Sequence, residues 1–243
     1  MRRNVRKLVV AAATAGLAVV LLAPSASARE YEVEVRNLTE GQPLTPPLAA
    51  THSGKNAIFR VGRAASVGVR EIAENGNLAP ALAQLEADPF DRIGRFTAFD
   101  EPLVPAGTPG AAMFADTATF TIRGPRSAKR FSWISMLICT NDGFAGANSL
   151  KLPRKVGDTK VKRSNAYDAR TELNTEDYAD IVPPCQGLIG DSSADEGTGV
   201  SNPDLAQGGV IGPHKGIAGG VDLKTDVHGW TDPVARVSVE RVG

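Results

Sequence analysis

The chain has 243 residues, of which 42% are hydrophobic and 22% charged, with 27 basic and 27 acidic side chains. This length suits a single domain with a substantial core. The absence of a run of basic residues argues against nucleic acid or an anionic membrane as a charge-driven partner.

The N-terminus is typical of a cleavable secretory signal. Four basic residues precede an apolar run, and the small residues Ala26 and Ala28 predict cleavage before Arg29. The apolar run is shorter than the roughly 20 residues that a membrane span needs, and no later segment is apolar enough to span a bilayer. We therefore expect residues 1–28 to be a signal peptide and residues 29–243 to form one domain, secreted or held in the cell envelope.

Removal of this signal changes the net charge. The 27 basic residues less the four of the signal leave 23, against 27 acidic residues, so the mature chain carries a charge of −4. The Arg2-Arg3 pair leaves open whether export uses the general or the twin-arginine route.

The first half of the mature chain predicts two strands and a helical insertion. Residues 31–35 alternate acidic and apolar side chains, which indicates a half-buried strand, and residues 57–61 predict a second short strand. Prolines at 43–47 exclude helix there. Apolar side chains then recur at helical spacing over 64–88, and the break at Asn75-Gly76-Asn77 predicts two short helices.

Strand patterns return after Pro89. The segments predicted as strands are 92–99, 111–123, 130–139, 158–163 and 235–242, the last with Val237, Val239 and Val242 as core candidates. Residues 186–232 are rich in Gly, Asp, Ser and Asn, and they predict a long loop region. Many short strands with frequent Gly and Pro indicate an all-β protein, an antiparallel β-sandwich.

The two cysteines predict a disulfide. Cys139 and Cys185 lie 46 residues apart in a chain that we expect to be exported, and an oxidising compartment favours pairing. Closing that loop removes about 4 kcal/mol of unfolded-state entropy. Two buried free thiols are the alternative.

Two acidic turns predict a calcium site. Asp142 follows the most apolar predicted strand, and Asp168 and Glu172 are four residues apart in a later turn. Calcium takes about six to eight oxygen ligands on a scaffold that can bend around it. The three carboxylates can share an ion only if the fold brings the two turns together, and the alternative is that both turns are solvated acidic loops.

Four segments together resemble the bacterial form of the spondin N-terminal domain, with the resemblance covering about 31–242. These segments are residues 31–52 (VRNLT, GQPLTPPLAATH), 58–66 (IFRVGRAAS), 136–146 (MLICTNDGFAG) and 167–176 (YDARTELNTE). The resemblance implies a Greek-key β-sandwich similar to the calcium- and lipid-binding modules of signalling proteins, with one calcium ion at one end.

The resemblance also implies the metal ligands. By position they fall on Asp142, Asp168 and Glu172. Two departures from the family pattern stand in the second turn. Arg170 replaces a glycine, which either stiffens the turn or brings a positive charge near the ion, and Glu172 replaces an aspartate, which adds one methylene of reach.

The three histidines carry the alternative of a secreted hydrolase. His214 and His228 lie in the loops at 205–230, whereas His52 is interpreted as part of a structural, hydrogen-bonded turn. No Gly-x-Ser-x-Gly and no His-Glu-x-x-His motif accompanies them. The sequence therefore favours a non-catalytic, calcium-stabilised module for binding or adhesion, whose extracellular partner is a protein, a glycan or a lipid headgroup. A structural envelope protein with a vestigial metal site is a third interpretation.

Overall fold

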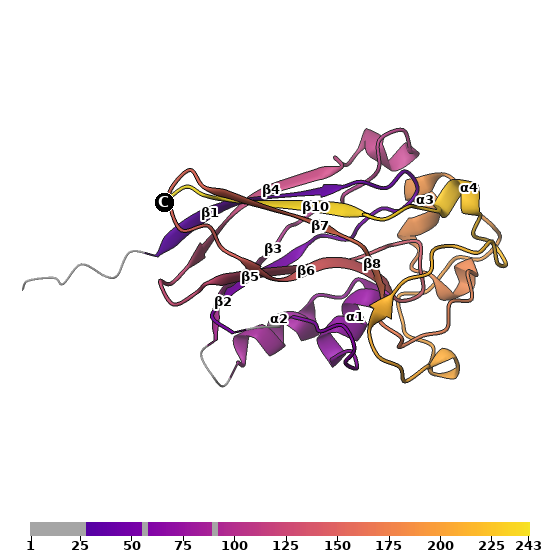
Figure 1. The fold of residues 1–243 in the computed structure, drawn as a ribbon. Coiled ribbons are helices and arrows are strands. Elements are labelled where there is room, and N and C mark those ends of the chain that lie inside the picture. The colour runs from indigo at the N-terminus through magenta and orange to yellow at the C-terminus, as the bar shows by residue number, and fades with distance from the viewer. Residues whose placement is uncertain (1–27, 55–57, 89–91) are drawn as a thin grey trace, which may run out of the picture.

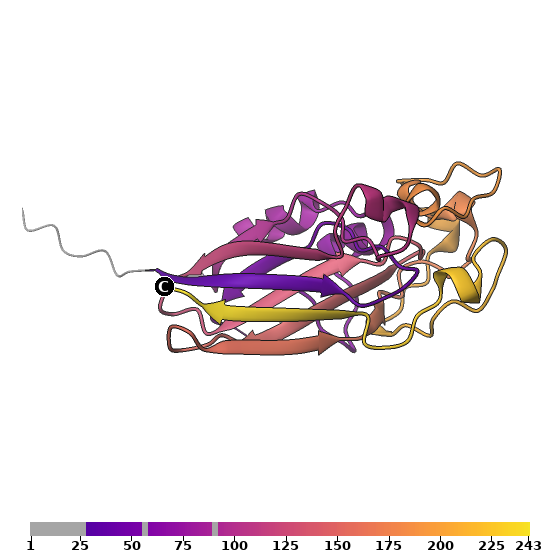
Figure 2. The same ribbon diagram turned by 90° about the horizontal axis from the view of Figure 1, so that it is seen from above.

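The computed structural model describes residues 28–54, 58–88 and 92–243, so the predicted signal peptide, apart from Ala28, lies outside the described residues. Two antiparallel sheets lie one over the other, and short helices and loops gather on one side and at one end (Figures 1 and 2). The prediction of an all-β sandwich is confirmed. Within the described ranges, no helix combines the length and the apolar character needed to cross a membrane.

The four-stranded sheet has the order β4-β1-β10-β7. Its strands are β4 (Thr117–Gly124), β1 (Arg29–Asn37), β10 (Ala235–Arg241) and β7 (Thr159–Ser164). Alternation in β1 and β10 directs their valines to one face, where Val33 pairs with Val239 and Val35 pairs with Val237. These four side chains are fully buried. Val242 follows the end of β10 and is 44% exposed, so its assignment to the core was wrong.

The six-stranded sheet has the order β3-β2-β5-β6-β8-β9. Its strands are β3 (Ile93–Ala98), β2 (Leu48–His52), β5 (Arg130–Met136), β6 (Gly143–Lys151), β8 (Ala166–Asp168) and β9 (Gly212–Pro213). The predicted strand at 130–139 is confirmed as a central strand over 130–136, and residues 138 and 139 belong to the turn that follows it. The sheet buries side chains on both faces. Trp133 of β5 faces the four-stranded sheet, whereas Ile134 and Met136 belong to a second hydrophobic cluster.

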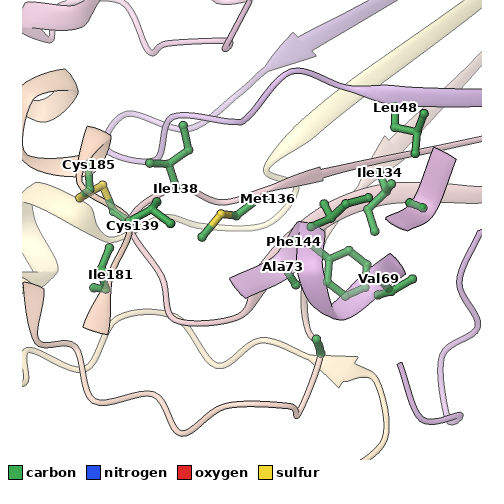
Figure 3. Close-up of a cluster of buried hydrophobic side chains, with 14 of the residues drawn as sticks. Leu48, Val69, Ala73, Ile134, Met136, Ile138, Cys139, Phe144, Ile181 and Cys185 are labelled. Atoms are coloured by element: carbon green, nitrogen blue, oxygen red, sulfur yellow. A yellow bond between two sulfur atoms is a disulfide. The ribbon is translucent and has the colours of Figure 1, made fainter. Parts of the chain in front are cut away.

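Helices α1 (Val67–Asn75) and α2 (Ala79–Glu86) cover that second face (Figure 1). Figure 3 shows Val69 and Ala73 of α1 packed near Ile134 and Phe144 of the sheet. Gly76 ends α1 with a left-handed φ of 64°, which a residue without a side chain adopts at little cost. The predicted pair of helices with a break at 75–77 is confirmed.

The remaining helical elements are single turns outside the sheets. They are η1 (Pro109–Ala112), η2 (Tyr178–Asp180), α3 (Pro184–Ile189), η3 (Pro203–Leu205) and α4 (Thr225–His228). η3 and α4 lie in the long segment 186–232, and α3 overlaps its start. This segment gathers at the end of the sandwich opposite the C-terminus (Figure 1). The prediction of a loop region there is confirmed.

Two predicted strands were wrong in whole or in part. Residues 58–61 of the predicted strand 57–61 form no strand, and residue 57 lies outside the described part. Phe59 is buried because its ring packs on Phe144 and Tyr167, with centroids 5.0 and 5.4 Å away, not because it belongs to a sheet. In the predicted strand 111–123, only the part from Thr117 onward is a strand, since Pro109 and Gly110 start a 3-10 turn before it.

The predicted disulfide is present. Cys139 and Cys185 are bonded with an S–S distance of 2.01 Å and a Cα–Cα distance of 5.1 Å. The bond ties the turn after β5 to helix α3, and both cysteines are fully buried in the cluster drawn in Figure 3. It therefore fixes the start of the 186–232 loops to the turn that carries Asp142.

Candidate metal centre

Asp142 lies in a tight turn between β5 and β6. The hydroxyl of Thr140 shapes this turn, because it donates to the carbonyl of Leu137 and accepts from the N–H of Gly143, at 2.7 and 2.9 Å. Since β5 and β6 are central strands, the turn is covered on all sides. Asp142 is consequently fully buried, although it occupies a loop.

The two oxygens of Asp142 have different surroundings. Oδ2 accepts hydrogen bonds from the backbone N–H groups of Thr171 and Glu172, at 2.7 and 3.0 Å. Oδ1 is buried and has no hydrogen-bond partner among the described residues. Buried polar atoms nearly always have a partner, so the orphaned Oδ1 is the feature of this site that needs a ligand.

Asp168 ends β8 and lies directly beside this turn. Its backbone pairs with Gly143 in the β6–β8 ladder, so the fold brings the two predicted acidic turns together. Oδ1 of Asp168 accepts from the N–H of Arg170 at 2.7 Å, and Oδ2 accepts from Asn174 at 3.2 Å. Arg170 has a left-handed φ of 57° and its Nε lies 3.3 Å from Oδ2 of Asp168. Arg170 therefore supplies a positive charge to one side of the site.

Burial dominates the electrostatics of this centre. Desolvation, together with the charge of Asp168, raises the pKa of Asp142 to about 6, against the lowering effect of the backbone N–H groups of Glu172 and Thr171. Desolvation likewise raises the pKa of Glu172 to about 7, with added repulsion from Glu74 and Asp142. Anionic groups are thus held in a place where their charge is unfavourable unless a cation is near.

The carboxylate of Glu172 bonds to a loop outside the two acidic turns. Its Oε1 accepts from the backbone N–H of Asn202 at 3.1 Å. In the described ranges, the acidic group whose carboxylate oxygens all lie within 4.8 Å of one another consists of Asp177, Asp195 and Asp222, and it does not include the predicted three. The structure therefore brings the turns of Asp142 and Asp168 side by side, but it does not gather the carboxylates of the three predicted residues within 4.8 Å of one another.

Two further acidic residues belong to this end of the molecule and were missed in the sequence. Glu74 of α1 is only 5% exposed, its Oε2 has no partner among the described residues, and its charge acts on Glu172. Its helix bears on the same loops, since Asn75 donates to Ser201 at 2.9 Å. Nothing in the sequence marks Glu74 as part of a site, because it lies in a helical segment whose apolar pattern predicts ordinary core packing.

Glu176 organises the last loops. Its carboxylate accepts three backbone N–H groups, from Ala218, Gly219 and Gly220, at 2.7, 2.8 and 2.6 Å. A buried acid that caps three consecutive amides fixes the path of the chain over 216–223. Glu176 is therefore a structural residue of this end, with both of its oxygens already satisfied.

The histidines are buried and already bonded. His228 is fully buried, its Nδ1 accepts from the N–H of Lys224 at 3.0 Å, and its Nε2 lies 2.9 Å from the hydroxyl of Tyr178. His214 accepts from the N–H of Gly216 at 3.0 Å, and its Nε2 has no partner among the described residues. Burial lowers the pKa of both rings. The described hydrogen bonds of these two rings include no serine or threonine hydroxyl.

Comparison with protein-family models and with curated proteins gave no match.

Proposed function

We propose that the protein is a secreted, non-catalytic, calcium-binding module of the spondin type that acts in binding or adhesion outside the cell or at its surface. The β-sandwich architecture and the adjacency of the two acidic turns support this proposal. The role proposed for calcium is to hold the turn at Asp142 and the turn at 168–172 in one arrangement, so that the loops at this end present a fixed surface to an extracellular protein, glycan or lipid headgroup.

The observation that carries the proposal is Oδ1 of Asp142. This oxygen is buried, has no described partner and belongs to a carboxylate beside Asp168. A hard cation such as calcium binds oxygen ligands and would compensate both negative charges. Asp142 and Asp168 would hold the ion first, and Glu172 would join by giving up its bond to Asn202.

Calcium should raise the melting temperature of the protein, and a chelator should lower it, because an ion that binds only the folded state stabilises it. Asp142→Asn is the sharpest variant. Asn keeps an oxygen for the N–H groups of Thr171 and Glu172, removes the charge, and replaces the proposed ligand atom Oδ1 with an amide NH2 group. In chelator, this variant should melt at or above the wild-type temperature, because its desolvated and repelled charge is gone, and it should no longer respond to calcium.

Asp158→Asn is the matched control, since Asp158 is an exposed aspartate at the other end of the molecule. It should keep the full response to calcium. A wild-type melting temperature that is equal in calcium and in chelator would refute the metal site, as would an Asp142→Asn variant that still responds.

A further inference from the structure

The end of the sandwich opposite the acidic loops carries a basic pocket. It is a depression of about 560 Å³ between the start of β5, the end of β6, the β6–β7 loop and the start of β1. Its lining residues include seven basic ones, which are Arg29, Lys129, Arg130, Lys151, Arg154, Lys155 and Lys160. They come from separate segments of the chain, which is why the sequence shows no basic run.

These positive charges are not neutralised within the described part of the protein. None of the seven takes part in a described ion pair. Two of them donate only to backbone carbonyls, Lys129 to Arg126 and Arg130 to Ser149. Asp158 is the single acidic residue of the lining. So many like charges around one depression repel one another and create a positive potential that attracts anions.

The shape and lining of the pocket indicate the kind of anion. Ala128 and Leu152 are buried and form an apolar floor beneath the charged rim. Among the described residues, no aromatic side chain lines the pocket, so this lining offers no ring on which nucleic-acid bases stack. A depression can also receive a protruding chemical group, whereas a flat surface would touch only its rim. Sugar units bearing anionic groups have both an apolar ring face and charges that the rim would meet.

We propose that this pocket binds a polyanionic glycan through its sulfate or phosphate groups. Arginine and lysine around the rim would bind the oxyanions, and the apolar floor would receive the sugar ring. The site is separate from the acidic end and does not depend on calcium. A protein with equal numbers of basic and acidic residues would thereby gain a local attraction for polyanions that its overall composition conceals.

The test is binding of a size-defined heparin oligosaccharide to the full mature protein, measured by calorimetry at low and at physiological salt. The variant is Lys155→Glu with Lys160→Glu, two exposed residues whose side chains have no described bonds. The matched control is Arg60→Glu with Arg63→Glu, which changes the net charge equally at exposed positions outside the pocket. The wild type should bind, with an affinity that falls as salt rises.

The pocket variant should bind roughly tenfold or more weakly, and the control should stay within about twofold of the wild type. Melting curves show whether each variant is folded, and Lys155→Gln with Lys160→Gln replaces the charge reversal if it is not. Equal losses in both variants would overturn the proposal, because binding would then follow net charge alone. Tighter binding to phosphatidylglycerol vesicles or to oligothymidylate, lost in the same variant, would overturn the choice of a glycan.

Discussion

His52 shows how a single buried ring couples stability to pH. It ends β2, is fully buried, and lies 2.7 Å from the carbonyl oxygen of Gly54 and 2.8 Å from the hydroxyl of Ser132. Because a carbonyl only accepts, Nδ1 must carry the proton of the neutral ring. Burial, together with the charge of Arg130, lowers the pKa of His52 to about 4, against the raising effect of the Gly54 carbonyl.

The lowered pKa of His52 predicts a loss of stability in acid. Between about pH 6.5 and pH 4 the unfolded chain binds a proton at this ring and the folded chain does not, so the free energy of unfolding falls as pH falls. The stabilising contribution of the neutral His52 ring is fully present above the pKa of histidine in the unfolded chain. As pH falls below that pKa, it is lost at about 1.4 kcal/mol per pH unit, roughly 3 kcal/mol in all. Urea unfolding at about pH 7 and about pH 5 measures the first part of this loss, about 2 kcal/mol.

His52→Gln is the comparison that isolates this ring, because glutamine offers a donor and an acceptor and does not titrate. We expect the difference in unfolding free energy between the two pH values to be smaller in the variant. Asp142 and Glu172 act in the opposite direction, since their raised pKa values favour the folded state as pH falls. They are the same in both proteins and cancel in the comparison. An identical pH dependence in both would contradict the prediction.

At the residue scale, the sequence predicted which residues belong to the site better than it predicted where their side chains point. It predicted the disulfide of Cys139 and Cys185 from the paired cysteines, whereas the meeting of Asp142 and Asp168 was an expectation that depended on the fold and on the family resemblance. It could not predict that Glu172 turns to the N–H of Asn202, because that bond joins segments 30 residues apart. Glu74 was missed for the same reason, since its neighbours come from tertiary packing.

At the scale of elements, alternation decided what could be predicted. β1 and β10 alternate because one face of their sheet is covered, and both were predicted. β2 was missed because all five of its residues are buried, so it shows no alternation. β6 was missed because its buried half, from Gly143 to Ala147, is made largely of small residues that resemble a loop. Central strands of a sheet covered on both faces lose the pattern that identifies strands.

Gly146 has no side chain and therefore leaves room for the segment around Phe59 to pack against β6. A Cβ added at this glycine would lie 2.5 Å from the carbonyl oxygen of Trp133 and 2.9 Å from the ring of Phe59. Gly146→Ala must therefore push β5 or the Phe59 ring aside. We expect it to lower the free energy of unfolding by about 1 to 3 kcal/mol, as overpacking of a core does. The shift in the urea midpoint at constant slope measures this loss.

Gly187→Ala is the matched control for Gly146→Ala. Gly187 lies in helix α3, and a Cβ added there meets nothing within 4 Å. Alanine is also the better helix former, so this variant should be neutral or slightly more stable. Equal effects of the two substitutions would show that Phe59 does not pack against β6 as described.

At the scale of the whole molecule, charge separates along the sandwich. Residues 166–232 carry twelve acidic and three basic side chains, whereas residues 126–163 carry nine basic and two acidic ones. Strand β6 joins the two ends, because Gly143 follows Asp142 and Lys151 lines the basic pocket. Nine residues of strand span about 30 Å. At physiological salt, charges are screened over about 8 Å, so the two ends act on one another only weakly.

This separation predicts that the two proposed sites are independent. Asp142→Asn should abolish the calcium-dependent rise in melting temperature and leave the affinity for the heparin oligosaccharide within about twofold of the wild type, because it removes one charge at about three to four screening lengths. Lys155→Glu with Lys160→Glu should do the reverse. Calorimetry in chelator measures binding of the oligosaccharide, and melting with and without calcium measures the response to the ion. Both are measured in the same four proteins, which are the wild type, Asp142→Asn, the lysine variant and the Arg60→Glu, Arg63→Glu control. An effect of Asp142→Asn on oligosaccharide affinity as large as that of the lysine variant would contradict the description of two separate ends. The acidic loops would then have to reach the basic pocket, either through a conformational change or through the ligand itself.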